Sequence, residues 1–203
     1  QGDAAAVARA VKSSGAEGVI EFTHPTAVLA NIEALLPLGL PLIVGTTGWN
    51  DKHEYVNELA KKVGGTIMTA GNMSIGVNMF YRIVEEAAKI MSQFSDYDVA
   101  VWEMHHNQKA DAPSGTAKLL LEAVDPRHEL TPVYGREGNC GKRDGKEIGM
   151  HALRGGTVAG THTVHFFGPD EEFEITHRAA SRQIFVNGAL HMARLLPGKA
   201  NGV

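Results

Sequence analysis

The sequence has little of what marks the specialised classes of protein. It contains one cysteine, Cys140, among 203 residues, which excludes an intrachain disulfide framework and suits a reducing compartment such as the cytoplasm. No run approaches the roughly 18 apolar residues of a membrane span, and no signal-peptide pattern is found. The net charge of −4 comes without a cluster of lysine and arginine, so no nucleic-acid partner is expected. We expect a cytoplasmic globular protein of one or two domains, without a membrane partner.

The ten histidines do not form a metal-binding pattern. His162 and His165 are three residues apart, but residues 157–167 alternate between polar and apolar as a strand does. An odd separation places the two side chains on opposite faces of a strand. No cysteine or carboxylate spacing completes a tetrahedral ligand set. We therefore expect no metal site, and favour structural or substrate-facing roles for these histidines.

Short apolar segments alternate with helical patterns in the first third of the chain. The expected strands cover residues 18–23, 40–44 and 66–69, and the expected helices cover residues 4–12, 24–36 and 50–62. Thr26 is the candidate N-cap of the second helix. This order predicts a parallel sheet covered on both faces, with ligands bound at the carboxyl ends of its strands. No G-x-G-x-x-G motif follows a strand, so either the phosphate-binding unit has been removed or is disordered, or the sheet binds another ligand.

The remainder of the chain predicts a second kind of sheet. Residues 76–94 form an amphipathic helix with one apolar stripe, and a strand over residues 99–104 follows. A short helix over 116–123 precedes three alternating segments, at residues 147–153, 157–167 and 173–178, and a last helix covers 180–196. Strict alternation indicates strands whose two faces differ. We expect a mixed or antiparallel sheet with the helices 76–94 and 116–123 against one face.

The run Glu103–Ala117, EMHHNQKADAPSGTA, concentrates groups suited to acid–base chemistry. A histidine such as His105 exchanges protons near neutral pH, and Lys109 offers a second proton or a charge for an anion. Ser114 is a candidate cap for the helix that follows, whose first amides, at Gly115 and Thr116, attract a carboxylate or phosphate. These groups predict a small anionic substrate that is protonated by histidine or lysine. The alternative interpretation is a polar strand end followed by a simple turn.

This run resembles the signature of the 4-hydroxy-tetrahydrodipicolinate reductase family, also called dihydrodipicolinate reductases. The similarity extends over nearly the whole chain and includes residues 22–25, 45–48, 72–78, 136–138, 174–179 and 181–182. The resemblance implies reduction of a cyclic dicarboxylate by NADH or NADPH in lysine and diaminopimelate synthesis. Neither nucleotide is favoured over the other.

The resemblance also assigns residues. His105 matches the general acid/base of the family and Lys109 matches its proton donor. His106, Gly115 and Thr116 match groups that hold the substrate carboxylates. The matches to the family's cofactor contacts are Gly45, Thr46, Thr47, Ala70, Gly71, Asn72 and Met73.

The implied fold class is α/β, with an incomplete Rossmann-type parallel sheet domain followed by an α+β substrate-binding and oligomerisation domain that has an open mixed sheet. The first domain covers residues 1–74, with the last helix, 180–203, packing back on it, and the second covers residues 75–179. The open sheet implies a homotetramer. The family's N-terminal glycine-rich part, roughly 50 residues if a βαβ unit takes about 30, is not in this sequence. Two alternatives stay open: a non-catalytic truncated fragment that binds dicarboxylate and oligomerises, and a related oxidoreductase acting on another carboxylate.

Overall fold

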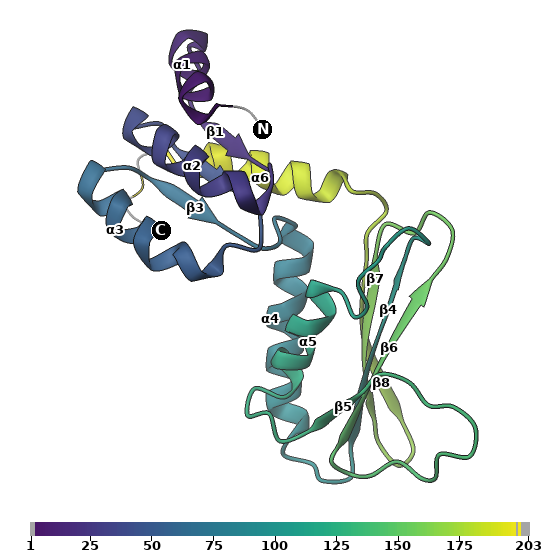
Figure 1. Ribbon diagram of the computed structural model, residues 1–203. Helices are drawn as coiled ribbons and strands as arrows, with labels where there is room; N and C mark the ends of the chain where they lie inside the picture. Colours follow the sequence, from purple (N-terminus) through teal and green to yellow (C-terminus); the bar gives the residue numbers. More distant parts are fainter. Residues whose placement is uncertain (1–2, 198, 200–203) are drawn as a thin grey trace. The chain divides into compact units, whose positions relative to one another are not determined.

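The protein is described here by a computed structural model that covers residues 3–197 and 199. The chain forms two compact units, one of residues 1–74 with 185–203 and one of residues 75–184 (Figure 1). The elements of the first unit are α1 (Ala4–Ser14), β1 (Val19–Glu21), α2 (Pro25–Leu35), η1 (Leu36–Leu38), β2 (Leu42–Val44), η2 (Asn50–Lys52), α3 (His53–Val63), β3 (Ile67–Thr69) and, from residue 185 onward, α6 (Gln183–Leu195).

The sheet of the first unit is parallel, in the order β1-β2-β3. The central strand β2 is buried on both faces, because successive side chains point to opposite sides of a strand. Leu42 and Val44 pack into a core with α2 and α3, whereas Ile43 packs with Met73 and Ala189 of α6. The expected parallel sheet with helices on both faces is confirmed.

Two ends of helices in this unit differ from the sequence prediction. The N-cap of α2 is His24, whose Nδ1 accepts a hydrogen bond from the amide of Thr26, so Thr26 is not the cap. The imidazole replaces the hydroxyl as acceptor because Pro25 occupies the first helical position and places Thr26 one residue further in. The expected helix over residues 50–62 begins instead as the 3-10 turn η2, and α3 starts at His53.

The second unit is built around a five-stranded mixed sheet. Its elements are α4 (Ile75–Met91), β4 (Asp98–His105), α5 (Gly115–Val124), β5 (Thr131–Val133), β6 (Glu147–Arg154), β7 (Thr161–Phe167) and β8 (Glu172–Arg178). The strand order is β5-β6-β4-β7-β8, with β4 parallel to β6 and antiparallel to β7. Both α4 and α5 lie on one side of the sheet in Figure 1 and share one apolar core with it. The mixed sheet and the placement of the two helices are confirmed.

Three details of the second unit and the last helix were not foreseen. The short edge strand β5 contains Pro132, which is tolerated there because proline cannot donate to a ladder on its outer side. Strand β7 starts only at Thr161, after a turn that ends at Gly160 with a φ of 153°. Helix α6 begins at Gln183 rather than at residue 180, because the Ser181 hydroxyl accepts from the Gln183 amide. Within the described residues, every helix is too short or too polar to cross a bilayer.

Gly188 of α6 is required by the backbone beside it. A Cβ at this position would lie 1.7 Å from the carbonyl oxygen of Met73, which cannot move aside as a flexible side chain can. We expect Gly188→Ala to destabilise the first unit by at least about 1 kcal/mol, although alanine favours a helix by about 1 kcal/mol over glycine. Urea denaturation measures the change. Gly145→Ala, where a Cβ would meet no atom within 4 Å, is the matched control, and equal stability of the two variants would contradict the prediction.

Candidate active site

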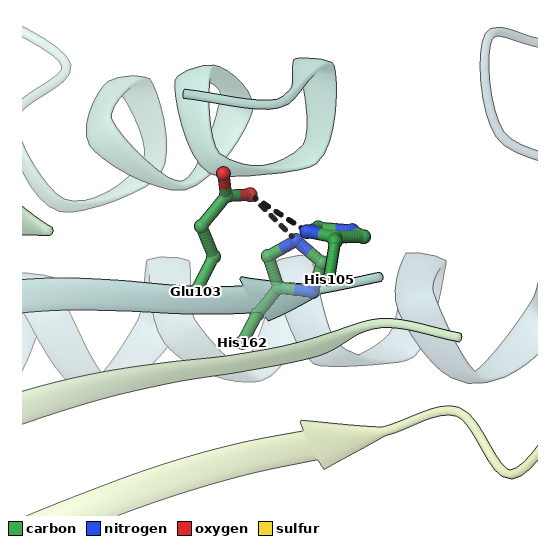
Figure 2. Close-up of side chains that lie close together, drawn as sticks. All are labelled: Glu103, His105 and His162. Atoms are coloured by element: carbon green, nitrogen blue, oxygen red, sulfur yellow. Dashed lines mark ion pairs between the residues drawn. The ribbon is translucent and has the colours of Figure 1, made fainter. Parts of the chain in front are cut away.

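The end of strand β4 brings a carboxylate and two imidazoles together. Glu103 and His105 are two residues apart and point to the same, helix-covered face of the sheet, and Glu103 pairs with His162 of the neighbouring strand β7. Glu103 Oε2 lies 3.4 Å from His105 Nδ1 and 3.4 Å from His162 Nε2. Figure 2 shows the two rings approaching the same carboxylate oxygen. The two rings meet edge to face, with centroids 5.0 Å apart.

The second oxygen of Glu103 is held from two other elements. Arg154, which pairs with His105 at the end of β6, places its Nη2 2.8 Å from Glu103 Oε1. The amide of Ser114, just before α5, donates to the same oxygen at 3.1 Å. The Glu103 side chain is completely inaccessible to solvent, so its charge is stable only because these partners replace water.

The surroundings set the charges of this cluster. Burial alone raises the pKa of Glu103, but contacts with His162, Ser114 and Arg154 and the charge of His105 outweigh it and lower the pKa to about 2. Burial also lowers the pKa of His105 to about 4, against the opposing effect of Glu103. At neutral pH the carboxylate is therefore ionised and the imidazole of His105 is neutral, which allows it to accept or pass on a proton.

The N-terminus of α5 lies against this cluster. Ser114 is its N-cap, as the sequence predicts, and its Oγ accepts from the amide of Ala117 at 3.2 Å. The same Oγ lies 3.3 Å from His162 Nε2. Gly115 is the first residue of the helix and Thr116 the second, and a Cβ at Gly115 would meet nothing within 4 Å. The first turn of the helix therefore offers an anion a positive partial charge next to the buried carboxylate, with open space beside Gly115.

Lys109 and His106 lie in the loop between β4 and α5. Lys109 Nζ is 2.7 Å from Asp111 Oδ1, and this ion pair lowers the pKa of Asp111. The amide of Lys109 donates to the carbonyl of His106 at 3.2 Å, which closes a turn directly after the strand. The charge of Lys109 is close enough to contribute to the lowered pKa of His105. The loop therefore keeps a cation near the imidazole.

The residues matched to cofactor contacts lie in the first unit, in two turns. Gly45, Thr46 and Thr47 follow β2, and the residues from Ala70 to Met73 follow β3, its parallel neighbour. A Cβ on Gly71 would lie 3.9 Å from Thr47 Cγ2, so the two turns are adjacent. The structure brings all seven residues to the carboxyl edge of one sheet, the usual place for ligands.

Some of these seven residues already make contacts within the first unit. The Thr46 hydroxyl donates to Glu21 Oε2 at 2.6 Å, and the Thr46 carbonyl accepts from Trp49 Nε1 at 2.7 Å. Met73 is buried in the core beside α6. A Cβ on Gly45 would lie 2.2 Å from the ring of Phe22, so this glycine makes room for the phenyl ring. Thr46, Met73 and Gly45 thus shape the turns, and Gly71 leaves open space at the edge.

Two clusters in the described part of the chain have the donor atoms of a metal site. In the first, formed by Glu103, His105 and His162, the guanidinium of Arg154 binds the same carboxylate and opposes a second cation. The second cluster contains His165 with Glu172 and Glu174. There the indole of Trp102 donates to His165 Nε2 at 2.9 Å, so Nδ1 carries the proton and binds Glu172 as a donor. Neither arrangement favours a metal ion.

A cavity of about 470 Å³ opens elsewhere in the second unit. Its lining includes Asp98 and Val99, at the start of β4, and Val124 at the end of α5. The cluster around Glu103 lies at the other end of both elements. This cavity and the acid–base groups are therefore separate features of this unit.

Two family models match the chain almost end to end. The model described as "Dihydrodipicolinate reductase, N-terminus" matches residues 4–73, and the one described as "Dihydrodipicolinate reductase, C-terminus" matches residues 76–203. A curated relative named 4-hydroxy-tetrahydrodipicolinate reductase, from Cupriavidus pinatubonensis, is 42% identical over 195 residues, which are 94% of this chain and 72% of the relative. The chain belongs to the dihydrodipicolinate reductase family. The resemblance noted in the sequence is confirmed.

Another curated relative matches the chain closely, and solved structures share its fold. The protein of the same name from Methanobrevibacter smithii is 40% identical over 95% of this chain and 71% of its own. A dipicolinate-bound dihydrodipicolinate reductase from Paenisporosarcina sp. TG-14 superposes with a TM-score of 0.77 at 22% identity, over 97% of this chain and 75% of that chain. A structure described as Ari2 gives a TM-score of 0.56 at 10% identity, over 95% and 53% of the two chains. These two structures support the fold.

Three members of the cluster were not among the predicted site residues. Glu103 opens the motif EMHHNQKADAPSGTA, His162 lies within the expected strand 157–167, and Arg154 directly follows the expected strand 147–153. Alternation could have placed Glu103 on the face of His105, since they are two residues apart. The pairing of Glu103 with His162, and of His105 with Arg154, depends on strand register between distant segments. The sequence signal for these contacts is correspondingly weak.

The lowered pKa of His105 has a measurable consequence for stability. The unfolded chain takes up a proton on this histidine near pH 6.5, and the folded protein only near pH 4. We therefore expect neutral His105 to make its full contribution to the free energy of unfolding above about pH 6.5. This contribution should be lost progressively as the pH falls from about 6.5 to about 4. The free energy of unfolding, measured by urea titration across this range, should depend less on pH in His105→Asn. If NMR shows that the imidazole of His105 titrates near pH 6.5 in the folded protein, this prediction is wrong.

Proposed function

We propose that this protein reduces 4-hydroxy-tetrahydrodipicolinate to tetrahydrodipicolinate in lysine and diaminopimelate synthesis, as the names of its relatives suggest. One observation carries the proposal beyond those names: a buried, neutral His105 faces an ionised Glu103 at 3.4 Å, beside the N-terminus of α5. This juxtaposition suits a reaction on a small dicarboxylate, because one group exchanges a proton while another binds a carboxylate.

Different residues of the chain bind the substrate and transfer protons. The amides at Gly115 and Thr116 bind one substrate carboxylate at the positive end of the helix, and His106 contributes to its binding. Lys109 donates the proton that the reduced substrate takes up. His105 acts as the general acid/base, since its neutral form is present above about pH 4. The ion pair of Lys109 with Asp111 involves a half-exposed carboxylate, so an anionic substrate can compete for the lysine at little cost.

The adjacent turns after β2 and β3 suit a nicotinamide nucleotide, NADH or NADPH. Such a cofactor supplies the hydride of the reduction when it is bound. The residues present fit this group: the two turns share one sheet edge, and a Cβ at Gly71 would have only Thr47 nearby, at 3.9 Å. We assign Gly45, Thr46 and Thr47 and the run from Ala70 to Met73 to this contact. Residues 1–74 then form the dinucleotide-binding domain, which the helix within 180–203 completes, and residues 75–179 the substrate-binding and oligomerisation domain.

The second domain also suits self-association. The face of its sheet opposite α4 and α5 carries Trp102, Leu153 and Phe167, as strand alternation and register require. Leu153 is 51% exposed and Phe167 38%, and exposed apolar residues gathered on a sheet mark interaction surfaces. We propose a homotetramer, assembled through this face, in the cytoplasm.

The catalytic assignments predict a selective loss of turnover. We expect His105→Ala and Lys109→Ala each to lower kcat by about 10²- to 10⁴-fold, the range usual for removal of a positioned acid or base. Oxidation of NADH or NADPH in the presence of the substrate, followed at 340 nm, measures turnover. Lys146→Ala, which removes an exposed lysine from a loop of the same domain, is the control and should keep normal kcat.

Three results would count against the residue roles or the proposed function. Normal turnover in the variant that carries both changes would refute the roles of His105 and Lys109. Calorimetric binding of pyridine-2,6-dicarboxylate, without binding of either nucleotide, would instead support a non-catalytic dicarboxylate-binding protein. Turnover with a different carboxylate alone would indicate a related oxidoreductase.

The proposed tetramer makes a separate prediction. Leu153→Asp places a charge on the open sheet face, where its burial at an interface would be costly, and should lower the mass measured by light scattering at micromolar concentration. Val63→Asp is the control, because Val63 is similarly apolar, 37% exposed and outside this sheet. A monomeric mass of the unmodified protein would refute the proposed assembly.

A further inference from the structure

Glu103 has four partners that come from four different elements. Its Oε1 accepts from Arg154 of β6 at 2.8 Å and from the Ser114 amide before α5 at 3.1 Å. Its Oε2 faces His105 of β4 and His162 of β7, each at 3.4 Å. The carboxylate is therefore the point at which the acid/base histidine and the anion-binding helix end are joined.

We propose that Glu103 is the positioning residue of the site, which holds His105 with its proton on Nδ1 so that Nε2 exchanges protons with the substrate. The inference rests on the proposed function for its kinetic consequence. Its structural basis is that Glu103 Oε2 and His105 Nδ1 are both buried, and neither has a hydrogen-bond partner within the described residues. An ionised carboxylate can only accept, so the nearest arrangement that satisfies both atoms is an Nδ1–H donor facing Oε2.

The distance of 3.4 Å between these atoms is longer than a formed hydrogen bond. Contacts of this kind are often long in the ligand-free protein and shorten when substrate closes the site. The motion required here is a few tenths of an ångström. The Glu103 side chain is held by two hydrogen bonds on its other oxygen, so the ring of His105 is the group that moves.

A glycine makes room for the opposite edge of the His105 ring. A Cβ at Gly160 would lie 3.2 Å from His105 Nε2, closer than nine in ten such contacts. Gly160 also has a φ of 153°, which side-chain-bearing residues rarely adopt. The chain thus places Nδ1 beside a fixed carboxylate and Nε2 beside a backbone without a side chain, so the two nitrogens have different surroundings.

The same carboxylate sets the position of the helix N-terminus. The amide of Ser114 donates to Glu103, and the Ser114 hydroxyl caps α5. His162 contacts both Glu103 and that hydroxyl, at 3.4 and 3.3 Å. Loss of the carboxylate therefore affects the His105 ring directly, whereas the cap of α5 still has His162 as a neighbour. This difference predicts a larger effect on kcat than on KM.

The variant Glu103→Gln tests the proposal with little change of shape. The glutamine oxygen can still accept from Ser114 and Arg154, while its amide group donates towards His105 Nδ1 and forces the proton onto Nε2. We expect kcat to fall by at least about 100-fold, as for other histidines held in the wrong tautomer, with a much smaller change in KM for the dicarboxylate. Glu129→Gln, which changes an exposed carboxylate paired with Arg127, is the control for loss of one charge.

A second measurement needs no variant of Glu103. Nitrogen-15 NMR of the unmodified protein reports the tautomer of each neutral histidine, and the spectrum of His105→Asn identifies the signal of His105. We expect protonated Nδ1 in the unmodified protein and protonated Nε2 in Glu103→Gln. If Glu103→Gln does not fold, the unmodified protein alone decides the proposal.

The possible outcomes separate this inference from the proposed function. Protonated Nε2 in the unmodified protein, or equal kcat in Glu103→Gln and Glu129→Gln, would overturn the positioning role. Absence of reductase turnover in the unmodified protein with protonated Nδ1 on His105 would instead overturn the proposed function and leave the positioning role intact. Coordinated shifts of the His105 and His162 signals with micromolar zinc chloride would show a metal site, and would also overturn the inference.

Discussion

The buried charge of Glu103 is the constraint on which the second unit depends. Removing a carboxylate from water costs several kcal/mol even after the protein relaxes, and Glu103 is wholly inaccessible. The cost is offset only if Arg154, Ser114 and the two histidines arrive together. The register of β4 with β6 and β7 delivers Arg154 and His162, alternation within β4 delivers His105, and the start of α5 delivers Ser114. The mixed sheet thus supplies the partners that stabilise the buried charge of Glu103. In turn, the need to satisfy this charge favours one register of the strands at the site.

The first unit uses a buried carboxylate in a comparable way. Glu21, the last residue of β1, is 3% exposed and accepts from the hydroxyl of Thr46 and from the amide of Asn31. It thereby fixes the turn after β2, where the cofactor contacts are proposed. In both units a carboxylate at or near the end of a strand satisfies groups on the neighbouring segments. This arrangement keeps loop atoms in place without occupying the open side of the sheet edge.

The sequence predicted the elements better than their connections. Helical periodicity located α4, and the capping residue Ser114 located the start of α5. Alternation placed His162 and His165 on opposite faces of β7, as their contacts with Glu103 and Trp102 require. Local patterns carry no information on which strands become neighbours. The parallel pairing of β4 with β6, about fifty residues later in the chain, therefore could not be derived, and the contact of Arg154 with Glu103 was missed with it. The edge strand β5 was missed because three residues including a proline give no alternation to detect.

The two proton-carrying groups of the proposed site differ in how firmly they are held, and this difference suits their roles. His105 is 8% exposed and lies among buried partners, so a shift of only a few tenths of an ångström brings it into its working geometry. Lys109 extends from a loop and pairs with Asp111, whose side chain is 59% exposed, and such pairs contribute about 1 kcal/mol or less. A general acid/base benefits from preorganisation, because its orientation need not be recovered in each turnover. A lysine that must follow a substrate into and out of the site benefits from a partner that it can leave at low cost.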